Sequence, residues 1–159
     1  MGVLLTAERG HVVLLLFPRS NAGDHAELLE ELEGFSELAA ILHNARKGAD
    51  SPAAEPRAVA SAYVEFARMN PALYEAMFTL KVDLTFAQSD TPAPLHAAFV
   101  ELRDALAPLA GDRDMKTFTE VVWSALHGLV TFAQAGRLRP AFYDQRLATL
   151  LDQLGTARA

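Results

Sequence analysis

Hydrophobic residues recur at three- and four-residue steps along most of the chain, a spacing typical of amphipathic helices. The first predicted helix begins at Asp24, where Asp24 and Glu27 have a spacing related to the capping box. Asn70 and Pro71 mark an end and a restart, because proline disfavours helical geometry in the residue before it. The pattern predicts helices over about 24–46, 56–70, 71–80, 92–109, 114–135 and 140–154. We find no convincing strand and no internal repeat.

The predicted helix over residues 114–135 is apolar on two sides. One stripe consists of Phe118, Val122, Ala125, Leu129 and Phe132, and the other of Trp123, Leu126, His127 and Val130. A helix that is hydrophobic on both sides must be covered on both sides. We therefore expect it to be the central helix, covered by its own domain and by a partner.

Composition narrows the class of protein further. With 159 residues, of which 51% are hydrophobic, the chain has the size of one domain with an ordinary core. Its net charge of −6 and its scattered basic residues argue against a surface that neutralises nucleic-acid phosphates.

Several kinds of chemistry are excluded or unsupported. The absence of cysteine excludes disulfides, thiolate metal sites and cysteine nucleophiles. The histidines are dispersed, and no nucleophile elbow, phosphate-binding loop or dinucleotide fingerprint is visible. Ser124 is expected to bond back to its own helix, and Glu30 and Glu31 to lie on a solvated face. We expect no catalytic residue, no metal site and no cofactor.

The longest purely aliphatic and aromatic run, Val12 to Phe17, is six residues long. That length is too short for a membrane span or a normal signal-peptide core. We therefore expect a cytoplasmic protein that does not interact with membranes.

The string Trp123-x-x-x-His127-Gly128 lies about fifty residues after the aromatic segment Tyr63 to Phe78. Together these motifs resemble the effector-binding domain of TetR-type transcriptional regulators, and more narrowly the subgroup named for its Trp-His-Gly string. The resemblance extends from about Asp24 to the C-terminus. It implies an all-α, multi-helix bundle that binds a small hydrophobic effector among its middle helices and forms a homodimer through its last two helices.

Aromatic and methionine side chains are the candidate walls of that effector cavity. The candidates are Tyr63, Phe66, Met69, Tyr74, Met77, Phe78, Phe99, Phe118, Trp123 and His127. The alternative is that these side chains fill the core and leave no cavity. If buried, Tyr63 and Tyr74 require hydrogen-bond partners for their hydroxyl groups.

His127 has two interpretations. It could hydrogen-bond an effector or change charge near neutral pH, or it could bond to a backbone carbonyl or an acid and hold two helices in register. Gly128, which is unfavourable within a helix, indicates close approach of another helix.

The last two predicted helices carry the candidate dimer interface. Its residues are Leu126, Leu129, Val130, Phe132, Ala133, Tyr143, Leu147, Leu150, Leu151 and Leu154. Two antiparallel helices from each subunit would form a four-helix bundle that buries more than about 1,000 Å². The alternative is that both stripes face the chain's own core.

Residues 1–23 are interpreted as a remnant or irregular segment, and residues 24–159 as the effector-binding and dimerisation domain. A TetR-type head of three helices requires roughly 40 residues. The only arginines or lysines in this segment are Arg9 and Arg19. Leu15 to Pro18 resemble a degenerate remnant of the end of such a head. DNA binding is expected only if a helix-turn-helix is encoded upstream. An upstream start codon, gene decay, a natural headless form and an experimentally chosen boundary remain open.

The chain is thus interpreted as the ligand-sensing, homodimerising domain of a TetR-like regulator without a complete DNA-binding head. Two alternatives remain. One is a purely structural or interaction module with a filled core. The other is a headless partner that forms mixed dimers with an intact regulator.

Overall fold

Helices dominate the computed structural model, which describes residues 3–8, 11–16, 22–79 and 91–156. The α-helices are α1 (Ala22–Lys47), α2 (Glu55–Met69), α3 (Pro71–Thr79), α4 (Ala93–Ala110), α5 (Met115–Gln134) and α6 (Tyr143–Thr156). A single turn of 3-10 helix, η1 (Pro140–Phe142), leads into α6. Each helix predicted from the sequence is present, and the expected all-α bundle is confirmed.

Local sequence explains where these helices begin and end. The side chain of Asp114 accepts hydrogen bonds from the backbone N–H and the hydroxyl of Thr117, at 2.9 and 2.8 Å, and so caps the start of α5. Asn70 ends α2 and donates from its side-chain amide to the carbonyl of Phe66 at 3.1 Å. Gly136, which follows α5, has a φ of +66° that a residue with a side chain rarely adopts.

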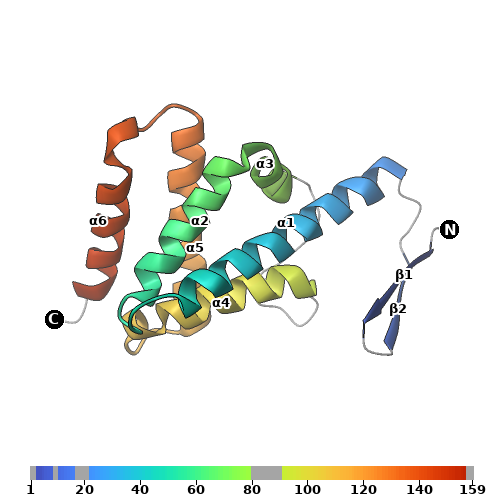
Figure 1. Ribbon diagram of the computed structural model, residues 1–159, viewed down its shortest axis with the longest axis horizontal. Coiled ribbons are helices and arrows are strands. Elements are labelled where there is room, and N and C mark those ends of the chain that lie inside the picture. The colour runs from blue at the N-terminus through green and yellow to red at the C-terminus, as the bar shows by residue number, and fades with distance from the viewer. Residues whose placement is uncertain (1–2, 9–10, 17–21, 80–90, 157–159) are drawn as a thin grey trace.

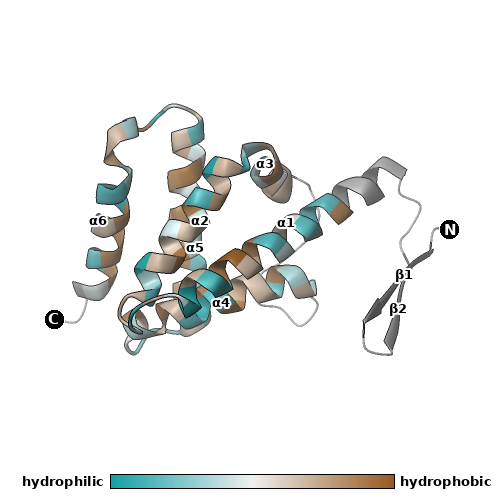
Figure 2. Ribbon diagram, viewed as in Figure 1, coloured by the Kyte–Doolittle hydropathy of each residue, from teal (hydrophilic) through white to brown (hydrophobic). Residues whose placement is uncertain are grey.

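The helices pack around one core. Helix α1 contacts α2, α3 and α4, while α5 packs against α2 and α4, and α6 against α2 and α4 (Figure 1). Brown and teal residues alternate along α1 and α2 in Figure 2, as expected for helices with one buried face. The largest fully buried side chains include Tyr63, Phe35, Phe99, Leu38, Leu42 and Leu126. None of the described helices is both long and apolar enough to cross a membrane.

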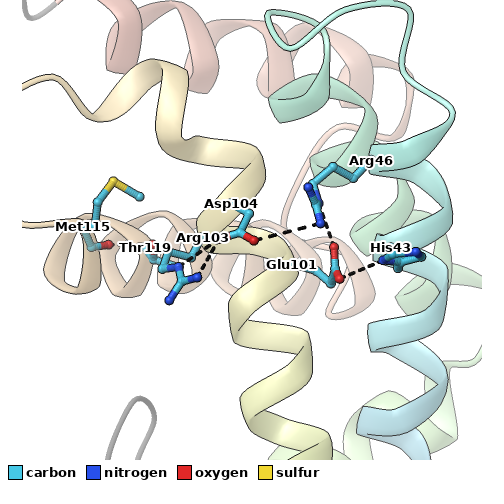
Figure 3. A network of polar contacts seen from close by, with 7 residues as sticks. All are labelled: His43, Arg46, Glu101, Arg103, Asp104, Met115 and Thr119. Atoms are coloured by element: carbon cyan, nitrogen blue, oxygen red, sulfur yellow. Dashed lines mark hydrogen bonds and ion pairs between the residues drawn. The ribbon is translucent and has the colours of Figure 1, made fainter.

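An ion network joins the C-terminal half of α1 to α4 (Figure 3). Glu101 accepts from the Arg46 guanidinium at 2.7 Å and lies 2.9 Å from Nδ1 of His43. Burial opposes ionisation of Glu101, but the hydrogen bonds from Arg46 and His43 outweigh it and lower its pKa. The network therefore fixes the position of α1 against α4.

The N-terminal segment contains two strands, although no strand was expected from the sequence. Strands β1 (Val3–Glu8) and β2 (His11–Leu16) form an antiparallel pair in which Val3 lies opposite Leu16. This hairpin includes Leu15 and Leu16, for which the sequence had indicated the end of a helical head. The sequence signal was two mainly apolar runs, Val3 to Ala7 and Val12 to Leu16, with Gly10 between them.

The expectation that Glu30 and Glu31 both lie on a solvated face is wrong for Glu31. Glu30 is exposed as predicted, but Glu31 is only 4% exposed. Its Oε2 atom has no hydrogen-bond partner among the described residues, and burial raises its pKa. It lies one helical turn before Phe35, on the buried face of α1. The two adjacent glutamates thus face different surroundings.

Candidate functional site

Four side chains from three helices form a continuous hydrogen-bonded chain. The indole Nε1–H of Trp123 on α5 donates to the hydroxyl of Tyr63 on α2 at 2.9 Å. The Tyr63 hydroxyl lies 2.6 Å from that of Tyr74 on α3, which lies 2.7 Å from Nδ1 of His127 on α5. The expectation that Tyr63 and Tyr74 need hydroxyl partners is confirmed. We call this set the Trp–Tyr–Tyr–His chain.

The donors and acceptors fix the direction of this chain. The indole N–H of tryptophan can only donate a hydrogen bond, so the Tyr63 hydroxyl accepts from it. The Tyr63 hydroxyl can then donate its own hydrogen bond to Tyr74. Tyr74 then donates to Nδ1 of His127, and the imidazole proton resides on Nε2. If Nδ1 carried a proton, Tyr74 would donate to Tyr63, and the Tyr63 proton would have no acceptor among the described residues. Every hydroxyl proton is used only when His127 is neutral and protonated on Nε2.

Burial favours the same protonation states. Desolvation raises the pKa values of Tyr63 and Tyr74, so both remain hydroxyl groups near neutral pH. Desolvation lowers the pKa of His127 below its ordinary value of 6.5, so the imidazole is mainly neutral at pH 7. The Trp–Tyr–Tyr–His chain therefore carries no net charge.

Aromatic rings pack against both ends of the Trp–Tyr–Tyr–His chain. The ring centroid of His127 lies 4.4 Å from that of Phe78 and 5.6 Å from that of Tyr74, with which it stacks. Phe99 on α4 stacks on Trp123 at 6.1 Å. Beside these rings is a pocket of about 140 Å³, lined by Phe78, Phe99, Glu120, Trp123, Ser124 and His127. We call it the His127 pocket.

The structure brings six of the ten candidate ligand residues together: Tyr63, Tyr74, Phe78, Phe99, Trp123 and His127. The other four lie elsewhere. Phe66 and Met77 are buried in the core and do not line the His127 pocket. Met69 is 64% exposed at the end of α2, and Phe118 lies near the start of α5 with the Arg113 guanidinium over its ring. Met69 and Phe118 do not line this pocket, and helical periodicity alone does not reveal which turn of a helix meets a cavity.

Two polar residues in the pocket wall were not predicted. Glu120 and Ser124 precede His127 by seven and three residues, so all three lie on one face of α5. This spacing was the available signal. The Ser124 hydroxyl donates to the Glu120 carbonyl at 2.7 Å, which confirms that the serine bonds back to its own helix.

The expectations for His127 and Gly128 are both revised. The described partner of Nδ1 of His127 is a tyrosine hydroxyl, rather than a carbonyl or an acid, and its Nε2 lies 3.4 Å from the Thr131 hydroxyl. A Cβ atom added to Gly128 would meet no described atom within 4 Å, so none of the described helices approaches it closely. The tight glycine contact occurs instead at Gly34, where an added Cβ would lie 2.7 Å from Sδ of Met77.

Three of the ten candidate interface residues are part of the chain's own core. Leu126, Val130 and Leu147 are buried against neighbouring helices and offer no surface to a partner. The others are exposed or half-buried: Leu129, Phe132, Ala133, Tyr143, Leu150, Leu151 and Leu154. The exposed side of α5 also presents Val121, and a groove between α5 and α6 contains Ala125, Leu129, Phe142 and Leu150.

Comparison with known proteins places this arrangement in a family. Residues 56–154 match the model of the tetracyclin repressor-like C-terminal domain. The chain belongs to this TetR-like family. TetR-like C-terminal domains are regulatory rather than catalytic, and they typically dimerise and bind small-molecule effectors.

A solved structure has a similar fold to this TetR-like domain. It is described as a protein with unknown function from Rhodococcus sp. RHA1 and is 26% identical, with a TM-score of 0.62. The match covers 81% of this chain and 69% of that one. No curated protein matches the chain significantly.

Proposed function

We propose that this TetR-like domain senses a small aromatic effector in the His127 pocket and forms a homodimer through α5 and α6. The observation that carries the proposal is the Trp–Tyr–Tyr–His chain, which ends at the wall of that pocket. A fully satisfied buried polar network positions its members rigidly, so its terminal group can recognise a ligand with little reorganisation.

The size and chemistry of the pocket support a small aromatic effector. A dry apolar cavity of about 150 Å³ in another protein accommodates benzene, so a pocket of about 140 Å³ accommodates one aromatic ring. Its walls are mainly aromatic, while Nε2–H of His127 can donate and the Glu120 carboxylate can accept. The proposed ligand is a single-ring compound with one polar substituent, such as a phenol.

A route from the pocket to α1 passes through α3. Tyr74 bonds to His127 and lies on the same short helix as Met77, which packs directly on Gly34 of α1. In an intact regulator, α1 would be the connection to a DNA-binding head. Suppose that α3 can adopt two positions and that the ligand has a higher affinity for one of them. Binding would then favour that position and would shift α1 as well.

Fluorescence of Trp123, the only tryptophan, tests the effector site. We expect phenol to change the emission in a saturable manner and Ser124→Phe, which fills the pocket, to abolish the response. Ser36→Phe is the matched control, because Ser36 is also exposed and also bonds back to its helix, at 3.0 Å. The absence of saturation, or equal loss in both variants, would refute the site.

Dimerisation is supported by the uncovered apolar side of α5. Val121 and Phe132 are 57% and 58% exposed, beside the groove that α5 forms with α6. Large exposed hydrophobic side chains on one helix beside an apolar groove are typical of protein–protein contact surfaces. We expect a dimer by size-exclusion chromatography with light scattering at micromolar concentration. Phe132→Glu should give a monomer, whereas Met69→Glu, at an equally exposed hydrophobic position on α2, should not.

The second candidate function is an interaction module with a filled core. It is favoured by the burial of Phe66 and Met77, which pack in the core away from the small pocket. A dimer that gives no saturable response to phenol would support this alternative. A saturable response that Ser124→Phe removes would exclude it.

A further inference from the structure

A larger cavity lies away from the His127 pocket, between the C-terminal parts of α2 and α5 and the start of α6. Its volume is about 510 Å³, within the range of roughly 300 to 1,000 Å³ that is usual for small-molecule sites. Val64 and Val130 contribute apolar wall, and Tyr143 and three arginines line it as well. We call it the Tyr143 cavity.

Tyr143 lines this cavity and has a hydroxyl group without a described partner, which is the first polar feature. The oxygen atom is buried and has no hydrogen-bond partner among the described residues. Desolvation raises its pKa, as do the nearby carboxylates of Asp144 and Glu65, so it remains a neutral O–H. A buried hydroxyl without a partner is unfavourable, and a ligand that accepts a hydrogen bond from it would remove this penalty.

Positive charge is the second feature. Arg68, Arg139 and Arg146 line the cavity, and Glu65 is the carboxylate in its wall. Arg68 is paired with Glu65 at 2.6 Å, but no described carboxylate forms an ion pair with Arg139 or Arg146. The Arg139 guanidinium lies over the ring of Phe142, and Arg146 donates to the Arg139 carbonyl. In a chain of net charge −6, Arg139 and Arg146 are thus two neighbouring cations without an ion-pair partner among the described residues.

We propose that the Tyr143 cavity binds an organic acid whose carboxylate is attached to an apolar body. The apolar walls would accommodate the body, while the Tyr143 hydroxyl and the guanidinium of Arg146 or Arg139 would bind the carboxylate. This site is separate from the proposed effector site, because none of the residues that line the His127 pocket lines the Tyr143 cavity. The inference does not depend on the proposed effector site, although the cavity shares Ala133 and Tyr143 with the candidate dimer interface.

Decanoate and decan-1-ol are suitable probes, because they share a hydrocarbon chain and differ in the head group. Isothermal titration calorimetry below the micellar range should show one decanoate per chain and at least tenfold weaker binding of decan-1-ol. Arg146→Gln should weaken decanoate binding at least fivefold, and Tyr143→Phe about threefold or more. Arg137→Gln is the matched control, because Arg137 is exposed nearby but does not line the cavity. It should leave the affinity unchanged.

Two variants that fill the cavities identify where decanoate binds. Ala133 lines the Tyr143 cavity and Ser124 lines the His127 pocket, and both are exposed positions on α5. Ala133→Phe should abolish decanoate binding, and Ser124→Phe should not. The proposal is overturned if decanoate does not bind, if decan-1-ol binds equally well, or if the loss follows Ser124→Phe or Arg137→Gln. Loss of the phenol response in the other pocket would leave these decanoate results unaffected.

Discussion

Removal of one hydroxyl from the Trp–Tyr–Tyr–His chain should destabilise the fold markedly. Tyr63 is fully buried, and its hydroxyl takes part in two hydrogen bonds, with Trp123 and Tyr74. Each hydrogen bond contributes about 1 kcal/mol, and leaving buried groups without a partner adds to the loss. We therefore expect Tyr63→Phe to lower the free energy of unfolding by about 2–3 kcal/mol.

Tyr143→Phe provides the matched control. It is the same chemical change at a hydroxyl that is also buried but has no hydrogen-bond partner among the described residues. Its removal should leave stability unchanged or raise it by up to about 1 kcal/mol. Urea unfolding followed by circular dichroism measures both variants, at one protein concentration because dimerisation is linked to stability.

A double-mutant cycle then isolates the bond between the two tyrosines. Tyr63→Phe and Tyr74→Phe remove the same 2.6 Å hydrogen bond. The double variant should therefore lose less stability than the two single variants together, by about 1 kcal/mol. If the losses in the free energy of unfolding were additive, or were equal for Tyr63→Phe and Tyr143→Phe, the Trp–Tyr–Tyr–His chain would not stabilise the fold as described.

Four further predictions concern packing and titration. Gly34→Ala should lower the free energy of unfolding by about 1 kcal/mol through overpacking against α3, whereas Gly128→Ala should not lower it, because an added Cβ meets nothing within 4 Å. Glu101→Gln should lower stability by about 1–3 kcal/mol at pH 7, and the difference should disappear as the pH falls below 4.5, where the lowered pKa no longer favours the folded state. Nuclear magnetic resonance should give His127 a pKa below 6.5 and a proton on Nε2 in its neutral form; a proton on Nδ1 would contradict the direction of the chain. Because burial raises the pKa of Glu31, stability should fall as the pH rises above 4.5, and Glu31→Gln should restore about 1 kcal/mol at pH 7 but nothing at pH 4.

Local signals explain why the helices were predictable. Asn70, Asp114 and Gly136 each mark a helix end through their own side chain or backbone preference, and the structure places ends at all three. The strand pair over residues 3–8 and 11–16 was missed, although two mainly apolar runs with a glycine between them are typical of a hairpin sequence.

The site was predictable only in its residue types. Tyr63, Tyr74, Trp123 and His127 were all candidates, but their mutual hydrogen bonds depend on how α2 and α3 pack against α5. Periodicity assigns a residue to one face of a helix without saying what covers that face. For this reason Leu126, which lies in the chain's own core, was predicted at the subunit interface.

The one-way order of donors in the Trp–Tyr–Tyr–His chain has an evolutionary consequence. Each member is chemically useful only while its neighbour remains, because the bonds run from side chain to side chain across three helices. Relatives that replace His127 with an apolar residue should therefore also have phenylalanine where this chain has Tyr74. We expect the four positions to covary in the family, and to be inherited or lost as a unit.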